Sequence, residues 1–543
     1  MKSGYQLPQR GLVSQQDAAT IENASIPRSK FLNQWSRKTA FDAGQLIPML
    51  VDEVLPGDHL SYNVTAYVRM STPLYPMFDN QRVDTHFFFV PARIIWANFI
   101  YFMGEQYDIG TSINYTIPVV AMLAGGNAVG SIYDHMGLPV IGQIAAATVL
   151  SVNSLPLRAY NKIFNDWFRD ENLVGASANI TGDGPDAYTS YTIRNRAKSH
   201  DYFTSALPWP QKFTAPLVPV GGLAPVTGLG AFDQTSNVGP ISVYETPSGN
   251  PSYAYYKGPL DATIAANRLY VNMAGPTSSY PAIYADLAQA SGITINQLRQ
   301  AFLIQQFLEQ NARGGTRYVE LIKQIYGVTS PDFRLQRAEY IGGGQSPLNI
   351  TPIAQTAPTA GVPLGAIGGA GTSAGSHRAS YAATEHGYII GLISVKSELS
   401  YQQGLSRLWT RSTRYDIYVP ALAGLGEQTV LMKEIYCTGV GANDNTVFGY
   451  QERWQEYRTK YSEVTGIMRS TAAGTLDGWH LAQKFLAAPT LNAAFIDDIP
   501  PMTRILAAAG ASTGQQYLAD IMYERVAIRP LPTYGTPVNL GRF

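Results

Sequence analysis

The strictest pattern in the sequence is an alternation of side chains over residues 59–71, HLSYNVTAYVRMS. Every second residue from Leu60 to Met70 is apolar or aromatic, and the residues between them are mostly polar. A period of two places the two sets on opposite faces of an extended chain. The segment therefore predicts a β-strand, and this strand limits the folds that the whole chain can adopt.

Further strands are predicted near both ends of the chain. Residues 82–91, RVDTHFFFVP, come soon after the first strand and are apolar on both faces from Phe87 to Val90. The pattern favours additional strands at 388–399, 414–419, 427–437 and 523–531. Strands early, strands late and long insertions between them fit a β-sandwich that pairs strands distant in sequence. They do not fit the βαβ alternation of a parallel nucleotide-binding sheet.

Residues 155–173, LPLRAYNKIFNDWFRDENL, predict an amphipathic helix. Its rings recur at helical spacing along one face, and Pro156 suits the first turn of a helix. We expect this face to be buried in the chain's own core or against another chain rather than to hold a cofactor. The candidate anchors on it are Tyr160, Phe164, Trp167 and Phe168.

The middle of the chain is uneven. A tract rich in Gly, Pro, Ser and Thr runs from about 214 to 285, and a second helix is predicted over 294–315, with Gly314 as its stop. The glycine-rich residues 342–376 are expected to be flexible or irregular.

Charge is scarce in this chain. Only 14% of the residues are charged, against about 25% in an ordinary soluble protein, and 39 basic residues balance 39 acidic ones. A chain with so little charge and no net repulsion is poorly protected against association. We therefore expect much of its surface to be buried between copies of itself.

Other sequence features limit location and redox chemistry. No apolar stretch is long enough to span a membrane, and the first residues, MKSGYQLPQRGLVSQQ, lack the apolar region of a secretory signal. We expect synthesis and folding in the cytosol. Cys437 is the single cysteine, which excludes an intrachain disulfide, and we expect it to be a small buried side chain.

Motifs of catalysis are weak, and we expect no enzyme activity, no cofactor and no metal site. Residues 371–375, GTSAG, match a nucleophile elbow formally, but no strand-to-helix turn is predicted around them. The sequence has no phosphate-binding P-loop and no H-E-x-x-H motif. A pair of carboxylates for glycoside hydrolysis stays open, because two such residues can lie far apart in a chain.

Several long stretches, in order along nearly the whole chain, carry a family resemblance. They are KTAFDAGQLIPMLVDEVLPGD (38–58), the helix at 155–173, KSHDYFTSALPWPQK (198–212), the segment 295–343, LWTRSTRYDIYVPALAGLGEQTVLMKEIY (408–436), VFGYQERWQEYRTKYSEVTGIMRS (447–470) and residues 476–496. Together they resemble the major capsid protein of the Microviridae, the small single-stranded-DNA bacteriophages, and most closely its gokushovirus branch.

The resemblance implies an eight-stranded antiparallel jelly-roll β-barrel, with residues 46–543 as one domain carrying long insertions. It implies sixty copies in a T=1 icosahedral shell around a circular single-stranded DNA, assembled in the cytoplasm of a host bacterium. Residues 221–290 are the candidate for a surface protrusion at the three-fold axes, used in host attachment. The implied partners are a minor DNA-pilot protein, a small basic DNA-binding protein, an internal scaffolding protein and a host cell-surface receptor.

Candidate contacts follow from charge and position. Residues 1–45 have a net charge of +3 and are expected to form an extended arm rather than a packed element, whose Arg28, Lys30, Arg37 and Lys38 neutralise DNA phosphates. Arg529 and Arg542, near the other end, are weaker candidates. Residues 192–212 interleave cations and rings, which suits single-stranded nucleic acid or an ordinary surface segment. Trp209 and Trp454 join the candidate core or interface anchors.

One alternative belongs to another class of protein. Jelly rolls also occur in lectins and glycosidases, so a carbohydrate-binding or glycoside-cleaving β-sandwich competes with the shell protein. It predicts a monomer or small oligomer instead of a large particle.

Overall fold

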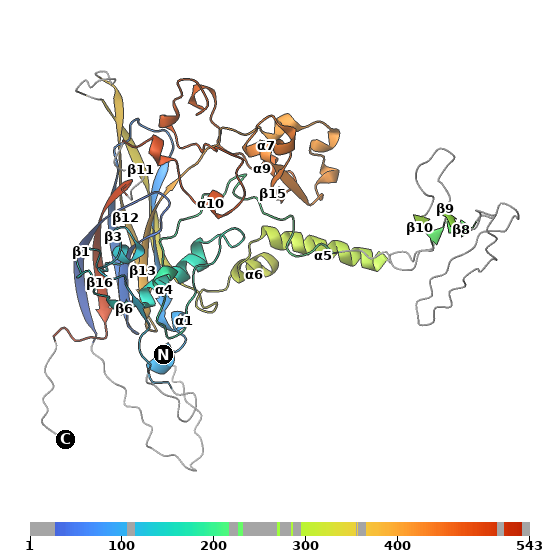
Figure 1. Ribbon diagram of the computed structural model, residues 1–543. Coiled ribbons are helices and arrows are strands. Elements are labelled where there is room, and N and C mark those ends of the chain that lie inside the picture. Colours follow the sequence, from blue (N-terminus) through green and yellow to red (C-terminus); the bar gives the residue numbers. More distant parts are fainter. Residues whose placement is uncertain are drawn as a thin grey trace, which may run out of the picture. The chain divides into compact units, whose positions relative to one another are not determined.

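The computed structural model describes residues 28–105, 115–216, 295–354, 356, 365–507 and 515–534, together with the backbone of short strands between 226 and 285. Contacts divide the chain into two units, Gln211–Arg313 and the remainder. The remainder is built on one eight-stranded antiparallel sheet that curves into a nearly closed barrel (Figure 1).

The strand order is that of a jelly roll, β1-β16-β3-β12-β11-β4-β13-β2, which confirms the expected fold class. The first strand of the chain pairs along its whole length with the last, from Ser29 opposite Arg529 to Phe41 opposite Tyr517. The strand bounds are β1 Ser29–Phe41, β2 Ile47–Val54, β3 His59–Met70, β4 Gln81–Pro91, β11 Glu339–Ala354, β12 Ile367–Ala382, β13 Gly387–Ser397 and β16 Tyr517–Arg529.

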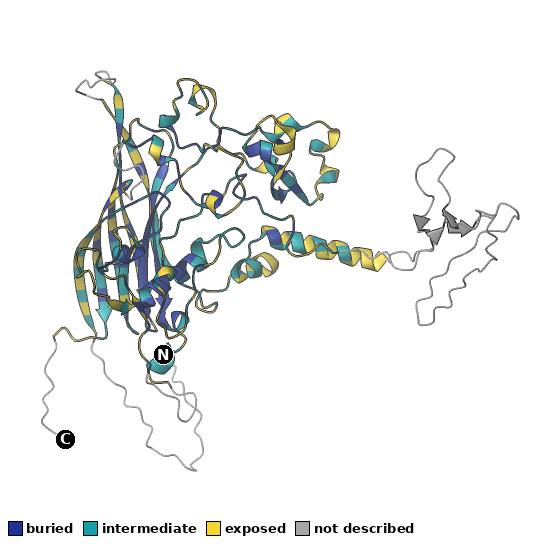
Figure 2. Ribbon diagram, viewed as in Figure 1, coloured by how far each residue is buried: buried dark blue, intermediate teal, exposed yellow. Residues whose placement is uncertain are grey.

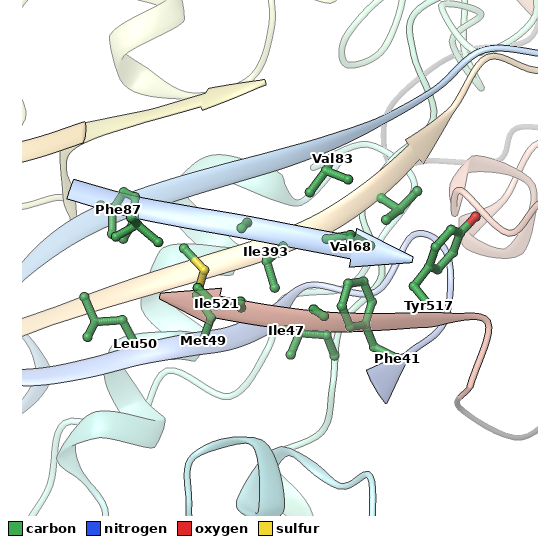
Figure 3. Packing of buried hydrophobic residues seen from close by; sticks show 14 of the residues in the cluster. Phe41, Ile47, Met49, Leu50, Val68, Val83, Phe87, Ile393, Tyr517 and Ile521 are labelled. Atoms are coloured by element: carbon green, nitrogen blue, oxygen red, sulfur yellow. The ribbon is translucent and has the colours of Figure 1, made fainter. Parts of the chain in front are cut away.

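The barrel interior is filled by the inward side chains of these strands. The apolar set of β3, from Leu60 to Met70, is buried as its alternation predicts. Figure 3 shows Val68 and Ile393 beside Tyr517 and Ile521, so strands from both ends of the chain share this core. Burial of so many apolar side chains is the main force that closes the barrel.

The two halves of the sheet differ in their outer faces. In β4, Phe87 and Phe89 point into the barrel core, whereas Phe88 and Val90 belong to a second core outside it. That second core is made with the insertion between β4 and β11, chiefly with α4 (Leu155–Ile163). β4 and β13 are therefore buried on both faces along most of their length, and the expectation for Phe87 to Val90 is confirmed.

Two insertions carry the remaining elements of the larger unit. The insertion between β4 and β11 contains α1 Ala92–Ile95, α2 Phe99–Phe102, β5 Val119–Ala121, α3 Ile132–His135, β6 Ser151–Asn153, α4 and α6 Tyr318–Tyr326. The insertion between β13 and β16 contains β14 Glu427–Leu431, α7 Met432–Ile435, α8 Gly441–Asp444, β15 Val447–Glu452, α9 Gln455–Arg458 and α10 Ala493–Ile496. Within the described ranges, no helix has the length and apolarity to cross a bilayer.

The smaller unit, Gln211–Arg313, contains one long helix, α5 (Ile295–Arg313), which confirms the helix predicted there and its stop before Gly314. Its short strands form two pairs, β7 (Val226–Thr227) with β10 (Tyr284–Ala285) and β8 (Leu229–Ala231) with β9 (Leu269–Val271).

The helix predicted at 155–173 is confirmed in its first part. It runs as α4 to Ile163, continues as a π-helical turn over Phe164–Phe168, and ends there. Its rings pack on Phe88 of the sheet.

Several expectations are wrong. Residues 342–376 are not irregular, because β11 and β12 occupy most of them as long paired strands. Residues 414–419 form a 3-10 turn and extended backbone instead of a strand, and the strand predicted at 427–437 ends at Leu431, where α7 begins. Residues 29–41 are a packed strand and no free arm, whereas residues 1–27 lie outside the described part of the chain.

Candidate functional site

One sheet face is left open in the described part of the larger unit: the outer face of β1, β16, β3 and β12. Figure 2 shows exposed residues alternating with intermediate ones along β1, and exposed residues alternate with buried ones along most of β16. Directly opposed residues of antiparallel strands share a face, so the pairing registers define rows across it. Three successive rows are Gln34–Glu524–Asn63–Arg378, Ser36–Met522–Thr65–Ser376 and Lys38–Asp520–Tyr67–Ala374.

Cations outnumber carboxylates on this open sheet face. Both carboxylates are engaged: Asp520 lies 3.4 Å from the Lys38 ammonium, and Glu524 accepts hydrogen bonds from neighbouring amides. Arg69 and Arg378 have no carboxylate partner among the described residues. The face thus carries four cations, Lys30, Lys38, Arg69 and Arg378, against two carboxylates, Asp520 and Glu524.

Amides and hydroxyls form a network between the strands of this face. The Asn63 amide donates to Glu524 at 3.0 Å, and the Ser376 hydroxyl donates to the Asn63 carbonyl oxygen at 2.8 Å. Gln34 donates to Glu524 at 3.3 Å, and Thr65 donates to Ser376 at 3.4 Å. Because all these groups are exposed, they can exchange partners with phosphate, sugar or base atoms of a polar ligand.

The basic residues predicted to bind nucleic acid fall into two groups, those exposed to solvent and those bonded within the chain. Lys30 and Lys38 point outward on the open sheet face, and Arg28 is exposed just before β1. Arg37 and Arg529 instead make bonds inside the chain. Arg542 lies outside the described residues.

Arg37 helps to close the barrel. β1 and β2 are the two edges of the sheet, and Arg37 of β1 donates to the Met49 carbonyl of β2 at 3.0 Å and to the His135 carbonyl. Tyr523 of β16 donates to the same Met49 carbonyl at 2.8 Å. Side chains therefore bridge the edges that backbone hydrogen bonds do not join.

Arg529 is similarly occupied. Its guanidinium donates to the Glu53 carbonyl at 2.9 Å and lies 3.4 Å from the buried Asp58 carboxylate. Arg529 would have to break these contacts in order to bind a phosphate.

Two cations of the 192–212 segment, Arg196 and Lys198, make contacts within the chain. Arg196 pairs with the buried Asp84 carboxylate, and Lys198 is buried with its ammonium 4.3 Å from the Phe495 ring centroid. Burial lowers the pKa of Lys198 to about 8, although Asp498 lies near it. Burial likewise raises the pKa of Asp498 to about 6. These groups form an internal ionic network rather than an open surface.

The aromatic candidates of the first helix lie in or beside the second core. Tyr160 and Phe164 are buried, and the Tyr160 hydroxyl donates to the Leu46 carbonyl at 2.9 Å. Trp167 is half-buried and donates to the Ala338 carbonyl at 2.7 Å, and Phe168 packs edge-on against Phe88. The whole set serves the chain's own packing.

The last two candidate anchors differ. Trp454 is buried in the later insertion, where its indole donates to the Leu422 carbonyl at 3.2 Å. Trp209 is half-buried. Cys437, expected to be buried, is an exposed free thiol, with Sγ 3.6 Å from an Asp444 oxygen.

Sequence reasoning missed Tyr67, Arg69 and Arg378 on the open sheet face. The signal for Tyr67 and Arg69 was present, because they occupy the outward positions of the alternating strand. Arg378 gave no such signal, because it lies just after the glycine-rich residues 342–376, and no strand was predicted around it.

Comparison with known proteins gives a consistent result over the whole chain. A family model described as capsid protein (F protein) matches residues 19–539. The chain is 41% identical over 541 residues to capsid protein VP1 of Bdellovibrio phage phiMH2K, covering 98% of this chain and 99% of that protein. It is 38% identical to capsid protein VP1 of Chlamydia phage 1, covering 99% of both chains. It is 35% identical to capsid protein VP1 of Spiroplasma virus 4, covering 96% of this chain and 97% of that protein.

Proposed function

This chain belongs to the capsid protein (F protein) family, and we propose that sixty copies of it close a T=1 icosahedral shell around a circular single-stranded DNA. Membership makes the chain a structural component of the virion and not an enzyme. The observation that carries the proposal is the likeness to capsid proteins from end to end, over one jelly roll with large insertions.

Exposed apolar side chains on the insertion between β13 and β16 support the proposed contacts between subunits. The insertion between β13 and β16 exposes large apolar side chains in a single copy, and the chain as a whole has few charges to keep copies apart. A closed shell buries such flanks through repeated, symmetry-related contacts. The exposed apolar residues of this insertion include Leu408, Trp409, Ile417, Leu425 and Leu486.

The open sheet face is our candidate for the surface that meets the DNA. Its excess of cations and its exposed amides and hydroxyls suit a polyanion, whereas the other half of the sheet is covered by an insertion. Lys30 and Lys38 stay candidates for phosphate neutralisation, and Arg69 and Arg378 join them. Arg28 and Arg542 remain candidates on charge alone.

Residues 221–290 are proposed as the surface protrusion used in host attachment, and most of them lie outside the described residues. The remaining proposed partners are the DNA-pilot protein, the small basic DNA-binding protein, the scaffolding protein and a host receptor. Deletion of 221–290 should leave particles that close normally but attach poorly to host cells. Normal attachment of such particles would remove the role in attachment.

Particle formation tests the central proposal. Expressed with the other phage proteins, sixty copies of the 59.1 kDa chain should give a shell of about 3.5 MDa, visible by negative-stain microscopy and containing nuclease-protected DNA. A chain that stays monomeric or forms small oligomers under these conditions would contradict the shell and favour the carbohydrate-binding alternative.

The role of the open sheet face is tested within such particles. Changing Lys30, Lys38, Arg69 and Arg378 to Gln should reduce the DNA recovered per particle while the shell still closes. The matched control changes four exposed cations of the later insertion, Arg414, Arg458, Lys460 and Arg469, to Gln. An equal loss of DNA in both variants would argue against a specific role of the face.

A further inference from the structure

Tyr67 and Arg69 form an exposed pair on the open sheet face, near the end of β3. Both side chains point outward from β3, and the Tyr67 side chain is 37% exposed. The Arg69 guanidinium carbon lies 5.1 Å from the Tyr67 ring centroid, and its Nε donates to the Tyr67 hydroxyl at 3.2 Å. The guanidinium thus fixes the orientation of a ring that solvent can still reach.

A hollow of about 460 Å³ lies beside this ring. Met522 contributes an apolar side chain that is 49% exposed, in the row next to Tyr67. Ser36, Thr65 and Gln34 contribute hydroxyls and an amide around it. Trp35 adds a second ring to the lining, and Asp520 adds a carboxylate that is paired with Lys38. An apolar surface bordered by polar groups and rings matches the chemistry of a flat heterocycle with polar edges.

We propose that Tyr67, held by Arg69, is a stacking platform for a base of single-stranded DNA, with the base seated in this hollow and its phosphates on the cations of the face. The inference rests on the proposed function, because it names what the open sheet face binds. The inference also goes beyond phosphate neutralisation, because it assigns to the open sheet face the binding of an unpaired base.

The positive charge of the open sheet face favours DNA over a second copy of this chain as its ligand. Arg69 and Arg378 lack carboxylate partners among the described residues, so both guanidinium groups are available to the phosphates of a polyanion. A second copy of this chain, with no net charge, offers no such general compensation. Double-stranded DNA hides its bases in the stack, whereas single strands present them to aromatic side chains.

Binding of the full-length chain to two probes tests the proposal. The probes are oligodeoxythymidylate and an abasic strand of the same length, which carries the same phosphates but no bases. The unaltered chain should bind oligodeoxythymidylate more tightly, and Tyr67→Ala should weaken this binding by roughly tenfold while leaving binding of the abasic strand unchanged. Tyr67→Phe, which keeps the ring, should bind like the unaltered chain.

A second Arg–Tyr pair provides the matched control. Arg414 lies 4.8 Å from the Tyr415 ring centroid and donates to its hydroxyl at 2.6 Å, on the later insertion and away from the sheet. Tyr415→Ala should therefore leave the affinity for both probes unchanged. Equal losses from Tyr67→Ala and Tyr415→Ala would overturn the proposal, as would a chain that binds the two probes equally well.

A direct readout separates stacking from a change in folding. Oligonucleotides with 5-iodouracil should photo-crosslink to the peptide that contains Tyr67, as mass spectrometry would detect. Crosslinks confined to other peptides would overturn the base site. Particles that still close and package DNA alongside that result would leave the proposed function standing, so the two failures are distinguishable.

Discussion

Arg158 and Asp186 form a bidentate ion pair that is closed off from water. The guanidinium donates from Nε and Nη2 to the two carboxylate oxygens at 2.8 and 2.6 Å, and the side chains are 1% and 0% exposed. Arg158 also donates to the Ile95 and Gly182 carbonyls, and Tyr191 donates to Asp186. The pair therefore joins α4 to the loops that cover one half of the barrel.

Breaking this pair should destabilise the chain strongly. Asp186→Ala leaves a buried guanidinium charge without its partner, and we expect a loss of about 3–5 kcal/mol in the free energy of unfolding, measured by urea denaturation. Changing both residues to Leu should cost clearly less, because no uncompensated charge remains. A double variant as unstable as Asp186→Ala would contradict this electrostatic explanation.

The half-buried His86 of β4 makes the fold sensitive to acid. Burial, together with the nearby Arg196 charge, lowers the pKa of His86 from 6.5 to about 4. Between these values the unfolded chain binds more protons, so the free energy of unfolding falls as the pH drops from 6.5 to 4. His86→Phe, which places a ring among Phe88, Phe168 and Tyr340, should weaken this pH dependence.

Melting temperatures across that pH range would measure the effect. His59 lies exposed at the start of β3, so His59→Phe is the control and should keep the acid sensitivity of the unaltered chain. An unchanged slope in His86→Phe would assign the acid sensitivity to other groups.

Glycine is required just after the bulge of β11. Gly343 has a φ of 156°, and a Cβ placed on it would lie 2.2 Å from the Thr85 carbonyl oxygen of β4. Gly343→Ala should therefore lower the free energy of unfolding by about 1–3 kcal/mol. At Gly368 of β12 the nearest atom would lie at 3.7 Å, so Gly368→Ala should be tolerated, and equal losses would contradict the steric argument.

Neighbouring cations of β1 should respond differently to removal. Arg37→Ala removes the Arg37 donor from the His135 carbonyl and one of the two donors, Arg37 and Tyr523, from the Met49 carbonyl, and should cost about 1–3 kcal/mol of stability. Lys38 is 75% exposed, and its surface ion pair with Asp520 should be worth no more than about 1 kcal/mol. Lys38→Ala should instead weaken DNA binding and its salt dependence. A larger loss of stability from Lys38→Ala than from Arg37→Ala would reverse this assignment.

Sequence patterns predicted those strands in which each face contacts only one kind of environment, either the apolar core or water. β3 alternates because one face meets the core and the other meets water. β13 is apolar or aromatic from Tyr388 to Ile393 because both of its faces are buried there. β1 does not show this pattern, because its inward face includes Asn33 and Arg37, which bond another side chain and the opposite barrel edge. These polar residues on the inward face of β1 interrupt the alternation of apolar and polar side chains from which strands are predicted.

The open sheet face could be predicted only in pieces. Lys30 and Lys38 were found by charge, but their neighbours come from strands far apart in the sequence, as the row Gln34–Glu524–Asn63–Arg378 illustrates. Nothing local in the sequence sets such pairing registers. The expectation for Arg37 ignored its orientation, which alternates with that of Lys38 along the strand.

Pairing of β1 with β16 has a consequence for the newly made protein. The partner of Ser29 is Arg529, translated 500 residues later (529 − 29), which takes roughly 25–100 s at bacterial elongation rates. During that time β1 and the adjoining edge of β3 emerge from the ribosome without the strand that joins them. The barrel of a nascent chain cannot be completed until β16 has been synthesised. Binding of chaperones to the exposed strands during synthesis would then determine what fraction of the chains aggregates.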